Sequence, residues 1–340
     1  MNPKINFIIF EVTSLCNNDC LYCYNIWKRP NESNIQYNSY KQALKTLKQI
    51  IKNINVDVVT FSGGEPMLAE RLNELVLYCR LKKKSVNIIT NGSNQDSKKY
   101  KELVDLGVSK FILPIHSYNP VTHDKMTRKA GSHSHVIDSI KKLQSMNTKI
   151  CADIVISKIN INELGETITY INDLGINDIM LTRYNIGGEG IRNADHLIPD
   201  IDSLRNVYSI ANSLVREIGV RITSNVCTPY CILNPDDYKQ IILVSCSTDI
   251  SKMPVTFDIF GNMRICNHSP VIIGNIYEKN IEDLINSDYI NNWKEIIPDY
   301  CIGCNIYNKC FAGCRAASEQ VNMGLSHPDP IINYYNNSNF

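Results

Sequence analysis

Short apolar runs alternate with amphipathic segments through the first two-thirds of this 340-residue chain. Most of the runs are continuous rather than alternating, which is typical of parallel strands covered on both faces. Between them, apolar positions recur at helical spacing, as in Val136, Ile137, Ile140 and Leu143. The predicted strands cover residues 6–11, 57–62, 86–90, 110–115, 150–156 and 178–181.

Six such β-then-α units predict right-handed crossovers and a parallel sheet that curls. Six units are too few for a full eight-stranded barrel, so we expect an α/β fold with a partial, TIM-like (β/α)6 barrel. A helix over residues 203–218 ends this domain, which we assign to residues 1–225. Residues 226–340 have short, broken secondary-structure signals and eight of the thirteen cysteines, which predicts a small cysteine-rich domain stabilised by metal.

Composition narrows the possible partners and the compartment. The formal net charge is only +1, so no basic face for nucleic acid is indicated. No segment reaches the roughly 18 consecutive apolar residues of a membrane span, and the N-terminus lacks the pattern of a signal peptide. We therefore expect a cytoplasmic protein that binds neither nucleic acid nor membrane. In a reducing compartment, thirteen cysteines indicate metal rather than disulfides.

Three cysteines, Cys16, Cys20 and Cys23, follow the first predicted strand directly. The spacing C-x3-C-x2-C lets three thiolates bind three irons of a [4Fe–4S] cluster and leaves the fourth iron open to a bidentate ligand. A zinc site usually has four ligands, and this loop contains no fourth cysteine or histidine. Tyr22 flanks the last of the three ligands.

The loop resembles the motif of the radical S-adenosylmethionine (SAM) superfamily. The resemblance implies that the three cysteines hold the cluster and that SAM chelates its open iron. It also implies that SAM is cleaved by one electron to a 5′-deoxyadenosyl radical, which abstracts a hydrogen atom from the substrate. The segment Ser62-Gly63-Gly64-Glu65-Pro66 follows the second predicted strand and matches the family's GGEP motif, which binds the methionyl ammonium of SAM.

Three further strand ends offer candidates for the SAM site. Asn91 follows the third predicted strand and Ser117 the fourth, where related enzymes often place contacts to the SAM ribose, and Arg183 follows the sixth. Each can equally be a solvated loop residue, and His116 can be a histidine hydrogen-bonded within the fold. No catalytic acid or base is assigned. The cofactor-binding candidates are Tyr22, Gly63, Gly64, Glu65, Pro66, Asn91, Ser117 and Arg183.

The C-terminal cysteines form a second pattern that resembles the SPASM domain, which is found in maturases of peptides, anaerobic sulfatases and quinone cofactors. The resemblance implies two auxiliary [4Fe–4S] clusters, the second of which uses a late cysteine in addition to three from the central run. The cysteines that match are Cys246, Cys266 and Cys314 for the first cluster and Cys301, Cys304 and Cys310 for the second.

The late cysteine is missing from this chain. Where family members often have Asp-Pro-x-Cys, the sequence reads Asp329-Pro330-Ile331-Ile332, and Ile332 cannot bind iron. The second cluster therefore has an open site, borrows Asp329 or His327, or uses an upstream thiol. Cys227 and Cys231 are the upstream candidates, and we expect one of them to complete the first auxiliary cluster. A zinc ribbon is the alternative for the C-terminal cysteines, but it leaves the spacing of the six matching cysteines unexplained.

On this resemblance, the leading hypothesis is a radical SAM peptide or protein maturase, an oxidoreductase that installs a post-translational modification. A reducing partner such as flavodoxin or ferredoxin is expected. Because the first strand begins near residue 6, a leader-bearing substrate is expected to require a separate leader-binding protein or the SPASM surface. The alternatives are radical SAM modification of a small molecule or tetrapyrrole, and a non-catalytic iron–sulfur electron carrier. The Gly63-Gly64-Glu65 motif argues against the carrier, which has no need of SAM.

Overall fold

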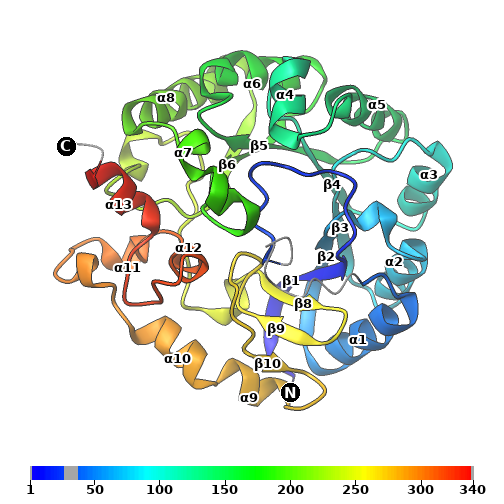
Figure 1. Cartoon of the computed structure of the whole chain (residues 1–340). Helices are drawn as coiled ribbons and strands as arrows, with labels where there is room; N and C mark the ends of the chain where they lie inside the picture. Colours follow the sequence, from blue (N-terminus) through cyan, green and yellow to red (C-terminus); the bar gives the residue numbers. More distant parts are fainter. Residues whose placement is uncertain (1, 27–36, 338–340) are drawn as a thin grey trace.

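A computed structural model describes residues 2–26 and 37–337 of the chain. Within these residues a ten-stranded sheet has the order β10-β9-β8-β1-β2-β3-β4-β5-β6-β7. Strands β1 to β7 run parallel to one another in sequence order, and the curled sheet is surrounded by helices on its outer side (Figure 1). These strands are β1 (Lys4–Thr13), β2 (Asn55–Gly63), β3 (Ser85–Ile89), β4 (Lys110–Pro114), β5 (Ile150–Ile156), β6 (Asp178–Arg183) and β7 (Arg221–Ser224).

All six strands predicted from the apolar runs are present as β1 to β6, so the prediction of a partial TIM-like barrel is confirmed. The parallel strand β7, which pairs with β6 through Asp178 and Arg221, was not predicted. It has only four residues, with the sequence RITS. A strand this short, with three polar residues among its four, leaves too weak a periodic signal to be found from the sequence.

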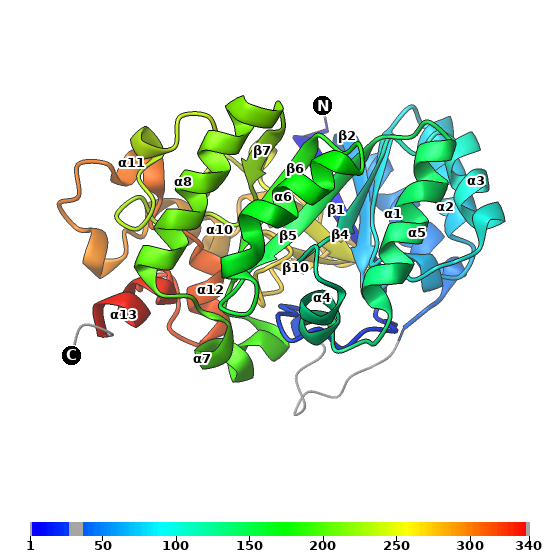
Figure 2. The ribbon, with the colours of Figure 1, turned by 90° about the horizontal axis from the view of Figure 1, so that it is seen from above.

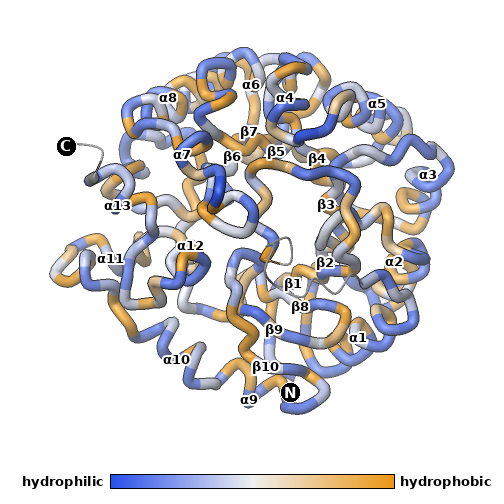
Figure 3. The backbone as a smooth tube through the Cα atoms, viewed as in Figure 1, coloured by the Kyte–Doolittle hydropathy of each residue, from blue (hydrophilic) through white to orange (hydrophobic). Residues whose placement is uncertain are grey.

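Local capping fixes the ends of the barrel helices, and each helix packs on the sheet through one apolar face. Ser39 caps α1 by accepting a hydrogen bond from Gln42 N, and Asp200 caps α8 by accepting one from Ser203 N. Figure 3 shows apolar strands inside and polar helix faces outside. The barrel helices are α1 (Tyr40–Asn53), α2 (Leu72–Leu81), α3 (Ser97–Asp105), α4 (Pro120–Thr127), α5 (Ser132–Ser145), α6 (Leu164–Asp173), α7 (Ala194–Leu197) and α8 (Ile201–Ile218).

The C-terminal region continues the barrel sheet. Strand β8 (Val255–Asp258) pairs in parallel with β1, and β9 (Asn262–Arg264) and β10 (Gly274–Asn275) add antiparallel strands beyond it. The predicted boundary after residue 225 follows the end of β7, but one sheet includes strands from both sides of that boundary.

The last helices lie between the two edges of the open barrel, from the β10 side round to α8 (Figures 1 and 2). They are α9 (Ile281–Ile285), α10 (Asp288–Glu295), α11 (Tyr307–Cys310), α12 (Arg315–Gln320) and α13 (Pro330–Asn337). Short 3-10 helices occur at η2 (Pro66–Leu68), η3 (Ile161–Glu163), η4 (Gly188–Asn193), η5 (Pro235–Asp237), η6 (Ile250–Lys252) and η7 (Asp299–Cys301). None of the described helices has the length and apolar character to cross a membrane.

Candidate functional site

The Gly63–Gly64 pair lies directly against the backbone that leads into the first cysteine loop. Gly64 N donates to Thr13 O at 2.7 Å, and Glu65 N donates to Leu15 O at 2.7 Å. A Cβ on Gly63 would lie 2.3 Å from Thr13 O, and one on Gly64 would lie 2.1 Å from Leu15 O. Gly63 also has a φ of +123°. Both positions therefore require glycine, because any side chain would push the cysteine loop away.

A second glycine turn supports the other end of the cysteine loop. Gly190 N donates to Cys23 O at 3.1 Å. Gly188 has a φ of +51°, and a Cβ there would lie 2.5 Å from the carbonyl carbon of Tyr24. The loop that carries Cys16, Cys20 and Cys23 is thus held between the turn after β2 and the turn after β6. None of the three cysteines forms a disulfide, and all three are partly exposed.

Glu65 is buried and joins the turn after β2 to the end of β3. Its Oε1 accepts hydrogen bonds from Met67 N at 2.9 Å and Thr90 Oγ1 at 2.6 Å, and its Oε2 accepts one from Asn91 N at 2.6 Å. Burial raises the pKa of this carboxyl, and these donors together with Lys99 oppose the rise. A carboxylate offers about four acceptor positions, so Oε2 has one position left for a cationic ligand. Pro66 occupies the first position of η2, where no N–H is needed.

Two asparagines in the cysteine loop bind the neighbouring strand ends. Asn91 Nδ2 donates to Asn17 Oδ1 at 2.8 Å, and Asn17 Nδ2 donates to Ser93 Oγ at 2.7 Å. Asn25, which is buried, donates to Gly63 O at 3.0 Å. Asn17 and Asn25 were not predicted from the sequence, because loop asparagines are common and only their partners reveal this role.

Tyr22 connects the cysteine loop to the end of β4. Its hydroxyl lies 2.5 Å from His116 Nε2, and the two rings meet edge to face. Because Val155 N donates to His116 Nδ1 at 3.2 Å, the neutral ring carries its proton on Nε2 and donates it to the phenol oxygen. The phenol hydrogen is then available to Cys20. Burial, followed by the charge of Cys20 and the hydrogen bond to it, raises the pKa of Tyr22 well above its usual value.

His116 belongs to a row of buried histidines, which agrees with its alternative interpretation as a fold histidine. His116 N donates to His123 Nδ1 at 3.2 Å, and those rings stack with centroids 5.2 Å apart. His133 meets His123 edge to face. Burial lowers the pKa of all three, that of His123 to about 3, so the row is neutral at physiological pH. Ser117 is fully buried and donates to Glu163, away from the thiols of the cysteine loop.

Asp153, in the middle of β5, is a carboxylate inside an otherwise apolar strand. Burial raises its pKa to about 6, and a hydrogen bond from Thr182 Oγ1 at 2.5 Å opposes the rise. Its charge also raises the pKa of Tyr22, so it lies near the cysteine loop. Asp153 was not predicted as a site residue, although an aspartate within the apolar run ICADIVI is unusual in the sequence.

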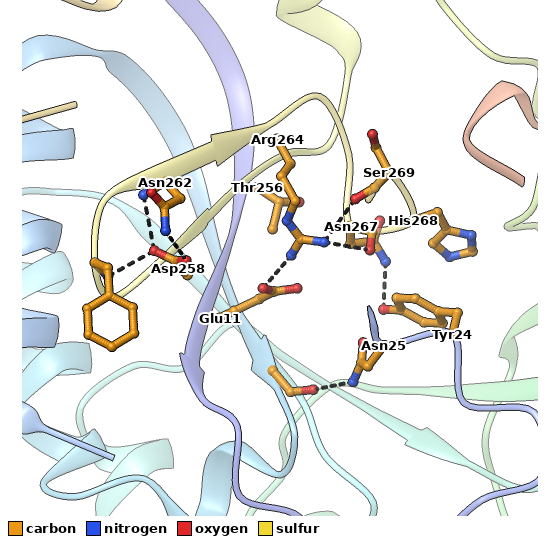
Figure 4. A network of polar contacts seen from close by, with 12 residues as sticks. Glu11, Tyr24, Asn25, Thr256, Asp258, Asn262, Arg264, Asn267, His268 and Ser269 are labelled. Atoms are coloured by element: carbon orange, nitrogen blue, oxygen red, sulfur yellow. Dashed lines mark hydrogen bonds and ion pairs between the residues drawn. The ribbon is translucent and has the colours of Figure 1, made fainter. Parts of the chain in front are cut away.

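A polar network joins β1, the cysteine loop and the β9 hairpin. Glu11 and Arg264 form a buried ion pair, with each side chain less than a tenth exposed. Figure 4 shows these two side chains pointing toward each other, Glu11 from β1 and Arg264 from β9. Asn267 Nδ2 donates to Tyr24 Oη at 2.7 Å, and the Tyr24 ring stacks on His268 with centroids 4.2 Å apart. The first cysteine loop is therefore in direct contact with the C-terminal region.

Arg183 lies at this boundary as well, but its guanidinium is used within the protein. It pairs with Asp329 at 2.6 Å, and both side chains are 1% exposed. It also donates to Thr228 Oγ1 at 3.2 Å, Cys227 O at 3.3 Å and Tyr184 O at 3.1 Å. Of the predicted cofactor-binding residues, the structure gathers Tyr22, Gly63, Gly64, Glu65, Pro66 and Asn91 around the cysteine loop, whereas the polar groups of Ser117 and Arg183 are bound elsewhere.

The eight C-terminal thiols fall into two groups of four. In the first, which we call the inner group, Cys227 hydrogen-bonds Cys246, and that bond together with burial raises the pKa of Cys227. The charges of Cys314 and Cys266 raise it further. Asn185 Nδ2 donates to Cys314 Sγ at 3.3 Å. The inner group is Cys227, Cys246, Cys266 and Cys314.

The second, outer group consists of Cys231, Cys301, Cys304 and Cys310. Burial raises the pKa of Cys301 to about 11, and the charges of the other three thiols add to that rise. Tyr230 N donates to Cys310 Sγ at 3.2 Å, which puts the turn that carries Cys231 against this group. Cys231 and Cys304 are exposed, unlike the buried Cys301 and Cys310. Among the described residues, no three His, Cys, Asp or Glu side chains lie close enough together to hold a single metal ion.

Residues 10–171, which include the first cysteine loop and the glycine turn after β2, match the family model described as "Radical SAM superfamily". Residues 10–171, just under half of the chain, are thus similar to the radical SAM superfamily. The chain is 22% identical over 334 residues to the PqqA peptide cyclase of Gluconobacter oxydans (strain 621H), an alignment that covers 95% of this chain and 89% of the relative.

Two solved structures share the fold of this chain. Streptococcus suis SuiB bound to S-adenosylmethionine has a TM-score of 0.73 and 15% identity, over 96% of this chain and 76% of SuiB. SuiB has also been solved with its precursor peptide SuiA, at a TM-score of 0.72. The structure of anSMEcpe with bound AdoMet has a TM-score of 0.71 and 16% identity, over 99% of this chain and 91% of that one.

The residues around the first loop fit the cofactor of the family. Three cysteines without a disulfide lie on one loop, next to a turn where backbone atoms block two Cβ positions. Glu65 keeps an acceptor position toward a cation, and Tyr22 donates to the sulfur of Cys20. This set of donors suits an iron–sulfur cluster with one open iron and an amino-acid ligand on it.

Proposed function

We propose that this chain is a radical SAM maturase that removes a hydrogen atom from a residue of a peptide or protein and so installs a post-translational modification. The observation that carries the proposal is the contact between the first cysteine loop and the C-terminal cysteine region, through Tyr24, Asn267 and His268. A site for SAM chemistry and a second field of thiols thus share one wall of the barrel. The similarity to a peptide cyclase over 95% of the chain supports a peptide substrate.

The protein's part in this chemistry is to bind and orient. Cys16, Cys20 and Cys23 hold a [4Fe–4S] cluster, and Gly63, Gly64, Glu65, Pro66 and Asn91 form the side of the site that receives SAM. When bound, the cluster and SAM supply the one-electron chemistry that removes the hydrogen atom. Tyr22 donates to Cys20 and fixes the orientation of that sulfur. Asp153, with a pKa of about 6, supplies the barrel interior with a carboxyl that can hold or release a proton near neutral pH.

The eight C-terminal thiols hold two auxiliary [4Fe–4S] clusters, one on the inner and one on the outer group. Bound to these thiols, the clusters would supply sites for electron uptake or relay, and a flavodoxin or ferredoxin in the cytoplasm would supply the reducing electron. A substrate peptide with a leader sequence binds either to a separate leader-binding protein or to the surface of the C-terminal region. SuiB, which has this fold, was solved with a precursor peptide bound.

The test begins with anaerobic reconstitution of the full chain and of a Cys16/Cys20/Cys23→Ala triple variant. We expect about twelve irons per chain to fall to about eight, with loss of reductive SAM cleavage in the triple variant. A Cys79→Ala variant is the matched control, since Cys79 is buried in α2, and it should keep both. Iron that falls from about four to none, with zinc retained, would refute the auxiliary clusters.

The substrate class is tested by co-expression with small peptides encoded beside the gene, followed by mass spectrometry. A peptide whose mass changes with the wild type, but not with the triple variant, supports the maturase. SAM cleavage that is stimulated by small molecules and never by peptides would instead identify a small-molecule enzyme. A protein that holds iron but never cleaves SAM would be an electron carrier.

A further inference from the structure

The segment that would carry the late cysteine of the outer cluster, residues 329–332, forms a buried structural contact in this chain. Ile332, at the position of the expected cysteine, is 3% exposed and packs in the core. Asp329 Oδ2 is bound by Arg183 at 2.6 Å and by Cys314 N at 3.0 Å. Its Oδ1 accepts from Ile331 N at 3.1 Å. Asp329 is 1% exposed and already balances the charge of the buried Arg183, whereas the thiol of Cys231 is exposed, so Asp329 is the poorer substitute ligand.

The turn that carries Cys231 lies directly against the outer group. Ile232 N donates to Pro229 O at 2.9 Å, which closes the turn. Tyr230 N donates to Cys310 Sγ at 3.2 Å. Pro229 packs so tightly on Gly313 that a Cβ there would lie 2.5 Å from Pro229 Cγ. The turn is thus seated on the loop between Cys310 and Cys314.

Helix α8 anchors the same turn from behind. Arg205 Nε donates to Ile232 O at 3.0 Å, and Arg205 Nη2 donates to Cys231 O at 3.3 Å. Cys227, four residues earlier, hydrogen-bonds Cys246 of the inner group. One short segment therefore presents one thiol to each group, and its backbone is held at both ends by residues outside it.

We infer that Cys231 is the fourth thiolate ligand of the outer auxiliary cluster, in place of the missing late cysteine, and that Cys227 completes the inner cluster. The inference rests on the proposed function, because it requires that this region holds iron. Each thiol gives up its proton when it binds iron. With four thiolates on each cluster, neither auxiliary cluster has an open iron for substrate, so both serve as electron carriers.

The assignment is tested in the Cys16/Cys20/Cys23→Ala background, where all remaining iron belongs to the C-terminal region. The background should hold about eight irons. Adding Cys231→Ala should lower this to about seven, with a [3Fe–4S] signal in the EPR spectrum of the oxidised protein, or to about four if the outer cluster is lost. His327→Ala, the matched control for the other candidate ligand, should keep about eight irons and give no such signal.

Three outcomes of this comparison count against the inference. Cys231→Ala with full iron and no [3Fe–4S] signal would overturn the assignment, and so would a [3Fe–4S] signal in the His327→Ala protein. Both results leave the auxiliary clusters intact. A background that holds zinc in place of iron would overturn the auxiliary clusters themselves, and this assignment with them.

Thiol labelling gives a second measurement that needs no change at Cys231. Cys231 is exposed in the folded chain, whereas Cys151 is 3% exposed. Iodoacetamide followed by peptide mapping should label Cys231 after iron is removed by a chelator and leave it unlabelled in the iron-loaded protein. Cys151 should resist labelling in the iron-loaded protein as a control. Labelling of Cys231 at the same rate with and without about eight auxiliary irons would overturn the assignment.

Discussion

Replacing Asp153 by asparagine should stabilise the protein, and by an amount that depends on pH. Burial raises the pKa of this carboxyl from 3.8 to about 6. The folded state therefore prefers the protonated carboxyl. Asp153 does not lower the free energy of unfolding below about pH 3.8, where it is protonated in both states. It lowers that free energy by the full amount above about pH 6, where it is charged in both states. A shift of about two units corresponds to about 3 kcal/mol. Asparagine has the same shape and keeps an acceptor oxygen for Thr182.

The expected effect on melting temperature follows from the size of the chain. With about 2.1 cal/mol/K of unfolding entropy per residue, 340 residues give about 0.7 kcal/mol/K, so 3 kcal/mol corresponds to about 4 °C. Asp153→Asn should therefore melt about 4 °C higher than the wild type at pH 8 and only about 1.5 °C higher at pH 4.5.

The measurement compares the melting temperatures of the two proteins under anaerobic conditions at the same scan rate and protein concentration. Asp138→Asn, an exposed change on α5, is the matched control and should shift the melting temperature little at any pH. The wild type itself should lose stability as the pH falls below about 6.5, because the three buried histidines bind protons only when unfolded. The difference between the two proteins removes this common effect. An Asp153→Asn protein that melts at or below the wild type at pH 8 would refute the reasoning.

Three other substitutions test separate parts of the site. Gly64→Ala would place a Cβ 2.1 Å from a backbone oxygen of the cysteine loop, and iron analysis should find about four irons fewer per chain; full iron content would show that the loop tolerates the shift. Tyr22→Phe removes a hydrogen bond to Cys20, so a redox titration followed by EPR should find a more negative potential for the first cluster at unchanged iron content; an unchanged potential contradicts this role. Arg183→Met leaves the buried carboxylate of Asp329 unpaired and should lower the free energy of unfolding in urea by about 3–5 kcal/mol. Adding Asp329→Asn should recover part of this loss, and a double variant no more stable than Arg183→Met argues against the pair.

The sequence by itself determined the elements whose signal is local. Six apolar runs became β1 to β6, because a strand covered on both faces needs a continuous apolar segment. The cysteine loop and the Gly63–Gly64 turn were also found from the sequence, since each is a contiguous motif at the end of a strand. Even the departure at Ile332 was visible, because one residue type replaces another at a fixed spacing.

The tertiary structure alone decided which distant groups meet. Arg183 looked like a site residue at a strand end, yet its partner is Asp329, 146 residues away. Strand β8 pairs with β1 although nearly the whole barrel separates them in sequence. The division of eight thiols between two groups, with Cys227 and Cys231 on opposite sides of one turn, follows from the same kind of contact. Sequence spacing records what is near along the chain, whereas these pairings depend on how the barrel closes and buries its edges.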